Sequence, residues 1–213
     1  MGIRWKHVKL AVPALLMLAV ITIAIFAPRI SNFDPTKQHL ADRLKPPSWA
    51  DRGDARFLLG TDHLGRDVYS RLLYGARISL PIALAATMVG GLVGIVLGLM
   101  SGYLRGTVDS IVSKLIDIQL SFPFILFAIA IIAVTGPNLI VLVLVLSARS
   151  WTTFARVVRG ETFSISGHDF ITAARALGAT QQRIIVRHIA PNILPLAVVV
   201  ASLDVGAIII LES

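Results

Sequence analysis

Three long stretches without charge constrain this chain more than any other feature. Residues 10–27 contain 18 positions without Asp, Glu, Lys or Arg, residues 78–104 contain 27, and residues 118–148 contain 31. A helix needs about 20 apolar residues to cross the hydrocarbon core of a bilayer. A chain of 213 residues cannot bury several such helices in a soluble core. The sequence therefore predicts an all-α, polytopic transmembrane helix bundle with the lipid bilayer as its surroundings.

The composition supports a membrane protein and excludes several other classes. The chain is 55% hydrophobic and 15% charged, with a mean hydropathy of +0.78, whereas soluble domains are about 45–50% apolar and about 25% charged. It has no cysteine, which excludes disulfides, Cys-ligated zinc and iron–sulfur clusters. The net charge of +8 reflects Lys and Arg on the cytoplasmic side, so we expect no nucleic-acid partner.

Five membrane spans are predicted. The first could be a signal peptide, but its apolar stretch exceeds the usual length of about 7–15 residues, so we expect a retained span. The Gly136-Pro137-Asn138 turn divides the third charge-free run into two helices. The five spans are expected at about residues 8–28, 78–104, 111–135, 139–155 and 192–211.

The basic residues predict the orientation of these spans. The N-terminus has three basic residues and no acid, and residues 149–188 have six arginines against two acids. Both should therefore face the cytoplasm. Residues 29–77 then lie outside, although they carry nine basic and six acidic residues, because long segments follow the rule less strictly. We predict two domains: residues 1–77, the first span with an external segment, and residues 78–213, the remaining spans with a cytoplasmic loop at 156–191.

Two acids and a row of glycines fall within the predicted spans. A charge at the bilayer centre costs about 2.5–3.5 kcal/mol on insertion scales. Asp204 and Glu212 are therefore candidates for a pathway or a subunit contact, with packing as the alternative for Asp204 and a position near the interface for Glu212. The second span holds Gly90, Gly94 and Gly98 at G-x-x-x-G spacing, which favours close packing of helix backbones.

A polar stretch at residues 59–71 precedes the second span. Thr61 or Asp62 is expected to cap a short helix that begins near Leu64. His63 and Asp67 are four residues apart, but no serine or second carboxylate completes a catalytic arrangement, so we expect a structured outer segment and no catalytic or metal site. The external motif consists of Gly60, Thr61, Asp62, Gly65, Arg66, Asp67 and Arg71.

The cytoplasmic loop is predicted to begin with a short helix at residues 168–177. Phe170, Ala174 and Leu177 share one face at i, i+4 and i+7 spacing. Gly178 follows as a helix stop. A loop this long and ordered between two spans indicates a docking surface, with an amphipathic connector lying on the membrane as the alternative.

A second short helix is predicted to follow. Thr180 can cap it, and Pro191 is expected to end it at about Ile189. Ile184, Ile185 and Ile189 give this helix an apolar side.

The run Thr172-Ala173-Ala174-Arg175-Ala176-Leu177-Gly178, with Pro191 thirteen residues after the glycine, resembles the EAA loop of ABC importer permeases. That pattern is Glu-Ala-Ala, three residues, Gly, nine residues and Ile-x-Leu-Pro. Thr172 stands in place of the Glu, His188 of the Ile and Ala190 of the Leu. The likeness to the peptide/nickel branch extends over nearly the whole chain, including residues 60–80, Phe122-Pro123-Phe124 and Gly206-Ala207-Ile208.

This resemblance implies a fold and a set of partners. The fold would be that of a type I ABC importer permease, which has six spans where five are visible here; the chain stops at Ser213, so we expect a shortened C-terminus. The partners would be a second permease subunit, two cytoplasmic ATPases and an external substrate-binding protein. The family's coupling helix implies that the ATPase is contacted by Thr172, Ala173, Ala174, Arg175, Leu177, Gly178 and Pro191.

The resemblance implies a permease subunit of an ATP-driven importer of peptides or related small solutes in the bacterial inner membrane, with a nickel-chelate importer as the alternative. No G-x-x-x-x-G-K-[ST] motif is present, so ATP and magnesium are expected on the partner ATPases and no cofactor on this chain. An intramembrane enzyme is a hypothesis from another class, but the spans lack His-x-x-Glu-His and paired aspartates. A solitary ion-driven carrier should show internal symmetry, which we do not see.

Overall fold

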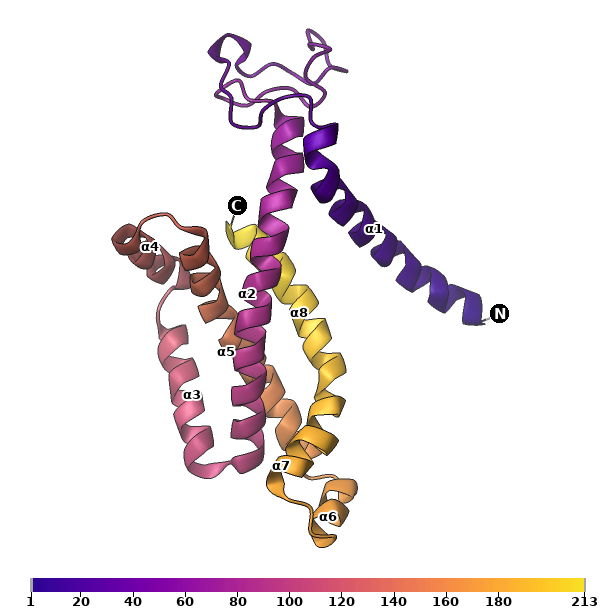
Figure 1. Cartoon of the computed structure of the whole chain (residues 1–213), viewed down its shortest axis with the longest axis vertical. Coiled ribbons are helices and arrows are strands. Elements are labelled where there is room, and N and C mark those ends of the chain that lie inside the picture. The colour runs from indigo at the N-terminus through magenta and orange to yellow at the C-terminus, as the bar shows by residue number, and fades with distance from the viewer. Residues whose placement is uncertain (1, 213) are drawn as a thin grey trace. The chain divides into compact units, whose positions relative to one another are not determined.

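The computed structural model describes residues 2–212, with side chains from Leu15 onward except that of Leu16. Within that range the chain forms helices and one isolated β-bridge between Thr61 and Asp67 (Figure 1). The predicted all-α class is therefore confirmed. The elements are α1 (Gly2–Ile30), η1 (Leu40–Asp42), α2 (Val68–Leu104), α3 (Gly106–Ser121), α4 (Phe124–Thr135), α5 (Leu139–Ile165), α6 (Asp169–Ala176), α7 (Gln181–Ile184), η2 (Ile185–Ile189) and α8 (Ala190–Glu212).

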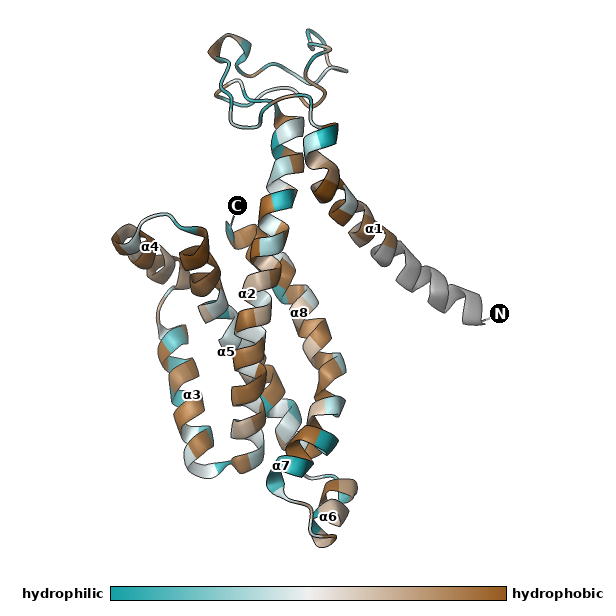
Figure 2. Cartoon of the chain, in the orientation of Figure 1, coloured by the Kyte–Doolittle hydropathy of each residue, from teal (hydrophilic) through white to brown (hydrophobic). Residues whose placement is uncertain are grey.

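Among the described residues, three helices are long and apolar enough to cross a membrane: Val68–Leu104, Leu139–Ile165 and Gln181–Glu212. They contain the predicted second, fourth and fifth spans. The predicted first span lies within α1, of which Met17–Ile30 forms a shorter apolar helix. Figure 2 shows apolar residues over α4 and over most of α8, as expected of surfaces that face lipid or other apolar helices.

The predicted third span is wrong as a single helix. Helix α3 ends at Ser121, α4 begins at Phe124, and the two are bent by 81°. The cause is Pro123, which lacks an N–H and pushes the residue before it out of the helical region; Phe122 is extended, with φ −100° and ψ 135°. Taken together, the two helices are apolar enough to form one broken span or a re-entrant loop.

The predicted break after the third span is confirmed. Helix α4 ends at Thr135, and Gly136 follows with a φ of +78°, in the left-handed region that glycine tolerates. The side chain of Asn138 then caps α5 by accepting a hydrogen bond from the Ile140 N–H at 2.8 Å. The turn therefore separates two helices as expected.

Glycines of α2 allow the backbones of α2 and α5 to lie in close contact, as their G-x-x-x-G spacing predicts. A Cβ placed on Gly94 would lie 2.5 Å from the Trp151 carbonyl oxygen and 2.6 Å from Phe154 Cβ. The neighbouring turns repeat this contact, so a seam of glycines runs along α2 against α5. The other pairs along the seam are Gly90 with Ser147, Gly98 with Val158 and Gly102 with Thr162.

The chain divides into two compact units, Met1–Leu80 and Pro81–Ser213. In the second unit, a buried apolar cluster joins the end of α2 to the end of α5 and to the elements between α5 and α8. This cluster fixes the 166–189 loop to the spans. Its buried members are Leu99, Tyr103, Val158, Ile165, Ile171, Ile184, Ile189 and Ile193.

Candidate functional site

Helix α6 is anchored by one apolar residue and leaves others exposed. Ile171 is completely buried in the cluster that joins the loop to the spans, and Ala174 packs against the same cluster. Of the three residues predicted to share a face, Ala174 packs against this cluster, whereas Phe170 is 44% and Leu177 is 88% exposed. Ile171 takes the inward position because it lies three residues before Ala174, on the same side of the helix.

The turn after α6 follows its sequence signals. Gly178 has a φ of +81°, its N–H donates to the Arg175 carbonyl at 2.9 Å, and the Ala179 N–H donates to the Ala174 carbonyl at 3.0 Å. These bonds satisfy the last carbonyls of α6, so Gly178 is the predicted helix stop. The Thr180 hydroxyl accepts from the Arg183 N–H at 3.3 Å, which confirms Thr180 as the cap of α7.

Pro191 does not end the second helix, contrary to prediction. Helix α7, the π-helical turn η2 and α8 form one continuous helix, Gln181–Glu212. In η2 the chain widens, and the Ala190 N–H donates to the Ile185 carbonyl five residues earlier. A π-helical turn leaves one backbone carbonyl without an N–H donor, and Pro191 has no N–H to donate. The unpaired carbonyl and the missing donor therefore occur at the same place, and the helix continues past Pro191.

The residues predicted to contact an ATPase lie mostly on the surface of this loop. Leu177 and Gly178 stand at the turn, and their neighbours Arg175 and Ala179 line a hollow of about 320 Å³. The Arg175 guanidinium lies 5.3 Å from the centroid of the Tyr103 ring, so Arg175 also ties α6 to the end of α2. Exposed residues of the predicted set are Thr172, Ala173, Arg175, Leu177, Gly178 and Pro191, while Ala174 is half-buried.

In segment 31–67 of the first unit, Asp62 organises a turn. Its carboxylate accepts from the backbone N–H groups of Leu64 at 2.8 Å and Arg66 at 3.0 Å. It also pairs with the guanidinium groups of Arg66 at 2.8 Å and Arg71 at 2.5 Å. The helix predicted near Leu64 is therefore wrong, because Asp62 bonds to its own backbone in a turn instead of capping a helix.

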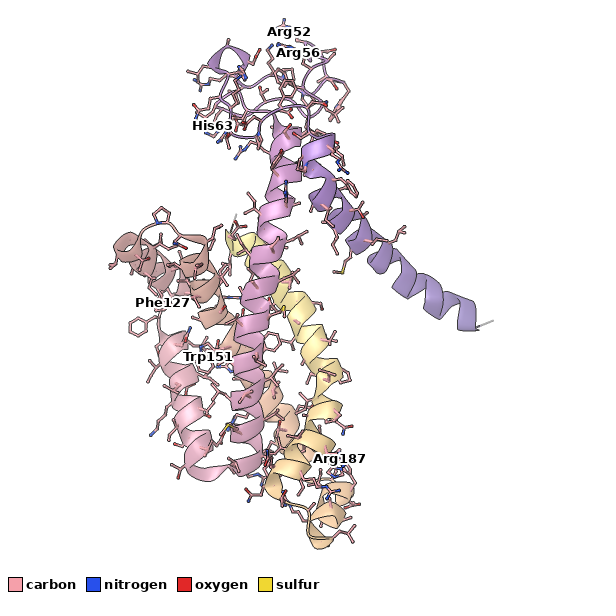
Figure 3. The ribbon with its side chains drawn as sticks, viewed as in Figure 1. Arg52, Arg56, His63, Phe127, Trp151 and Arg187 are labelled. Carbon is pink, nitrogen blue, oxygen red and sulfur yellow. The ribbon has the colours of Figure 1, made fainter. Side chains whose placement is uncertain are left out.

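Asp67 is the cap of α2. Its carboxylate accepts from the Ser70 N–H at 2.8 Å and the Ser70 hydroxyl at 2.5 Å, and α2 begins at Val68. Asp67 is 5% exposed, whereas His63 is exposed at the edge of the segment (Figure 3). Asp67 therefore has a structural role as a helix cap.

The remaining members of the external motif fix the backbone of this segment. Thr61 accepts from the Lys45 N–H at 2.9 Å and donates to the Asp42 carbonyl. Gly60 and Gly65 have φ values of +77° and +74°, and a Cβ on Gly65 would overlap the His39 carbonyl oxygen at 1.8 Å. Glycine is therefore required at position 65.

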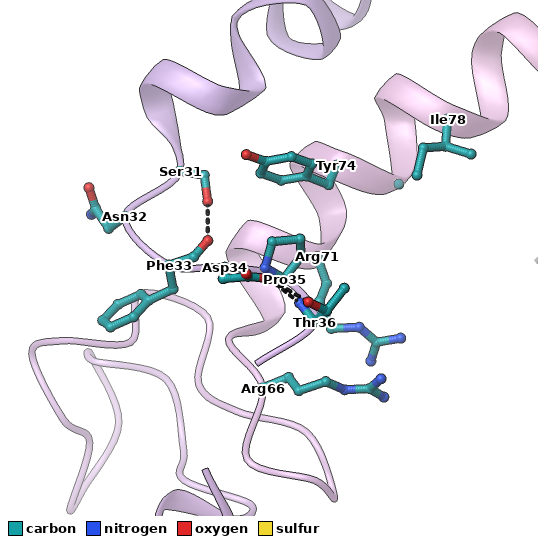
Figure 4. Close-up of a pocket in the computed structure, with 11 residues that line it drawn as sticks. Ser31, Asn32, Phe33, Asp34, Pro35, Thr36, Arg66, Arg71, Tyr74 and Ile78 are labelled. Carbon is teal, nitrogen blue, oxygen red and sulfur yellow. Dashed lines mark hydrogen bonds between the residues drawn. The ribbon is translucent and has the colours of Figure 1, made fainter. Parts of the chain in front are cut away.

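Arg66 and Arg71 also line a hollow of about 670 Å³ (Figure 4). Asp34 lies in its wall and accepts from the Thr36 N–H at 2.8 Å. The hollow therefore offers groups of both charges to a partner of mixed polarity. Its lining residues are Ser31, Asn32, Phe33, Asp34, Pro35, Thr36, Arg66, Arg71, Tyr74, Gly75 and Ile78.

The Asp62 turn should weaken in acid. Burial raises the pKa of Asp62, but hydrogen bonds from the Arg66 and Leu64 N–H groups and the Arg66 side chain outweigh it and hold that pKa well below its usual range. Because the pKa is lower in the folded chain, the stabilisation is complete above the unfolded pKa of about 4 and is lost as the pH falls through the folded value. We expect amide protection at Leu64 and Arg66, measured by hydrogen exchange and corrected for intrinsic rates, to fall steadily from about pH 5 to pH 2.

The matched variant is Asp62→Asn, which keeps the shape of the side chain and removes its charge. It should show low protection at these two amides and no dependence on pH over the same range. Equal protection of the unmodified chain at both ends of the range would contradict the role given to Asp62.

Asp204 lies at the meeting point of three helices in the second unit. It is 4% exposed, and its carboxylate accepts from the Ser150 hydroxyl at 2.5 Å and the Thr87 hydroxyl at 3.1 Å. Arg149 Nη1 lies 3.3 Å from Asp204 Oδ1. These partners come from α2 and α5 and Asp204 itself from α8, so Asp204 is a buried polar centre of the bundle.

The partners of Asp204 were not identified from the sequence. Arg149 is the first of the residues 149–188 that we predict to face the cytoplasm, but it is only the eleventh residue of α5, which continues to Ile165. The available signal was that Arg149 ends a charge-free run while residues 150–155 continue the helical pattern. Glu212, the other predicted pathway residue, is the last residue of α8 and is half-buried.

A second polar contact missed by the sequence analysis ties α3 to α5. Arg159 Nη2 donates to Asp109 Oδ2 at 2.7 Å, and the Ser101 hydroxyl donates to the same carboxylate. Trp151 lies beside α3 (Figure 3) and donates its indole N–H to Gln119 Oε1 at 3.0 Å. The α3–α5 contact is therefore partly polar, as hydrogen bonds between membrane helices often are.

Residues 94–213 match the family model described as "Binding-protein-dependent transport system inner membrane component". This chain belongs to that family. Its bundle is of the type I ABC importer permease kind, and it is a multi-pass membrane protein. Residues 2–47 of this permease match a second model, the N-terminal TM domain of oligopeptide transport permease C.

Individual relatives of this permease cover nearly all of it. It is 38% identical over 97% of its length to the di/tripeptide transport system permease protein DppC of Pseudomonas aeruginosa, and 41% identical over 99% of its length to the oligopeptide transport system permease protein OppC of Escherichia coli. It is 38% identical over 96% of its length to the dipeptide transport system permease protein DppC of Alkalihalophilus pseudofirmus. The chain covers 68%, 68% and 66% of these relatives, respectively.

Proposed function

We propose that this chain is a permease subunit of an ATP-driven importer of peptides in the bacterial inner membrane. The observation that carries the proposal is its likeness, over 96–99% of its length, to permease proteins named for di/tripeptide, dipeptide and oligopeptide transport. The subunit itself is not an enzyme. It forms part of the passage, and hydrolysis of ATP with magnesium takes place on partner subunits.

In this proposal the first half of the 166–189 loop, α6 and the turn at Gly178, contacts the ATPase. Leu177 is 88% exposed at the tip of α6, and an exposed leucine beside a glycine turn offers an apolar knob to a complementary groove. The other side of α6 is held by buried Ile171, in a cluster shared with α2, α5 and α8. A displacement of α6 by a closing ATPase dimer is thereby transmitted to those spans, because close-packed contacts transmit strain.

The remaining partners follow from the same proposal. A second permease subunit completes the passage, two ATPases supply the energy, and an external binding protein delivers the peptide. The segment 31–67, with its hollow and its paired charges, is the surface that this chain offers to the binding protein. Alternating access then results from rocking of the spans as the ATPases close and open.

ATP-dependent uptake tests the proposal. This chain is expressed together with a second permease, ATPases and a binding protein from the same organism, and the purified complex is reconstituted in vesicles with a labelled tripeptide outside. We expect accumulation of the peptide that requires ATP, the binding protein and this subunit. Accumulation that continues without ATPases, or that is driven by an ion gradient alone, would contradict the proposal.

A further inference from the structure

The Arg149–Asp204 pair lies deep in the bundle. Arg149 is the eleventh residue of α5 (Leu139–Ile165), and Asp204 contacts it from α8. At about 1.5 Å of rise per residue, Arg149 lies about 15 Å along the helix axis from the start of α5. The hydrocarbon core is about 30 Å thick, so the pair lies near mid-depth.

The two members of the pair are held very differently. Asp204 is 4% exposed and is bonded by two hydroxyls in addition to Arg149. Arg149 donates to Asp204 through Nη1 alone, at 3.3 Å from Asp204 Oδ1, and 32% of the Arg149 side chain is exposed. A guanidinium has five N–H groups in a planar fork, so this single contact leaves donors directed away from Asp204.

An exposed guanidinium at this depth faces water or protein, because charged groups within membrane segments turn to the bundle interior or to a water-filled cavity. The Ser150 and Thr87 hydroxyls already stabilise the Asp204 charge, so Arg149 is not its only source of compensation. The free edge of the guanidinium matches a carboxylate, which it binds more strongly than neutral acceptors.

We propose that Arg149 is a binding residue of the passage and that it takes the C-terminal carboxylate of a peptide in transit. Asp204 positions it, and Ser150 and Thr87 hold Asp204. This inference rests on the proposed function, since it assumes that peptides pass along this face of α5 and α8. It adds that the passage itself, and not the binding protein alone, distinguishes a peptide acid from its amide.

The test uses the reconstituted complex with all its partners, a labelled tripeptide and the same tripeptide with a C-terminal amide. Both are supplied at concentrations that saturate the binding protein. Because the binding protein is the same in every assay, a change in the acid-to-amide ratio of uptake rates reports on the permease. We expect Arg149→Gln to lower that ratio about tenfold, the effect of losing one charge-assisted contact, and Arg149→Lys to restore part of it.

Arg156→Gln is the matched control, because it removes the same charge from an exposed arginine of the same helix, two turns further along. It should leave the ratio unchanged. The inference is overturned if Arg149→Gln lowers the uptake of acid and amide equally, which would make the pair a structural contact within the chain or with the second permease. It is also overturned if Arg156→Gln lowers the ratio as much. Failure of the proposed function differs from both, since the unmodified complex would then import neither peptide.

Discussion

Replacing Leu177 with aspartate is expected to abolish ATP-dependent uptake while the chain still folds and inserts. The Leu177 side chain is 88% exposed, so its loss should change the stability of the fold by less than about 0.5 kcal/mol. In the complex the same side chain would be buried against the ATPase. A central apolar anchor in an interface contributes about 2 kcal/mol or more, and a buried carboxylate adds a desolvation cost. The affinity of the ATPase should therefore fall about 30-fold or more.

The measurement is titration of the purified ATPase against the permease complex in lipid nanodiscs, together with peptide uptake. Val186→Asp is the matched control, because Val186 is an exposed apolar residue, 63% exposed, in η2 at the end of the same loop. It lies outside the predicted contact and should leave ATPase binding unchanged. Unaltered uptake by the Leu177→Asp complex would rule out the docking role of the α6 tip.

Gly178→Trp should give the same loss by a different route. The space around a Cβ at this position is open, but the φ of +81° is one that residues with side chains rarely adopt. The substitution therefore strains the turn and covers the docking surface at once. Leu177→Asp is the cleaner variant, since it changes the surface and leaves the turn intact.

Local signals along the sequence predicted the helices and turns well. Long charge-free runs indicate membrane spans. The Gly178 stop and the Thr180 cap act through hydrogen bonds within a few residues, so these two helix ends were predictable. The bend between α3 and α4 also has a local cause, Pro123, although we did not predict it. Continuation of the helix through Pro191 was not predictable in this way, because it depends on a widened turn at η2, where Ile184 and Ile189 are held on both sides by buried contacts.

Tertiary contacts account for the rest of the candidate site. Asp204 stood out in the sequence because a charge within an apolar run is costly. Its partners did not, since Thr87 and Ser150 are 117 and 54 residues away in the chain and hydroxyls are common in spans. The sequence alone does not decide which residue of α6 points inward for a similar reason: Phe170 and Ile171 are both apolar, and only the packing of the loop against the spans distinguishes them.

Removing one member of the Arg149–Asp204 pair should destabilise the bundle far more than removing both. Asp204→Leu leaves a guanidinium near mid-depth without its acid, and breaking a buried ion pair in this way costs about 3–5 kcal/mol. Because Arg149 is 32% exposed, we expect the lower end, about 3 kcal/mol. The double variant Arg149→Leu, Asp204→Leu removes both charges, and replacement of a pair by apolar residues is often neutral. Its stability should lie within about 1 kcal/mol of the unmodified chain.

The measurement is the free energy of unfolding in nanodiscs for the unmodified chain, both single variants and the double variant. The coupling energy of this cycle separates the pair from the individual substitutions. A double variant as unstable as Asp204→Leu would mean that the hydroxyls of Ser150 and Thr87, left without their acceptor, matter more than the ion pair. A double variant that is fully stable but has lost the preference for peptide acids would show that the charges are not needed for folding. Their cost in the membrane is then balanced by recognition of the transported molecule, which is the outcome that the exposed edge of Arg149 favours.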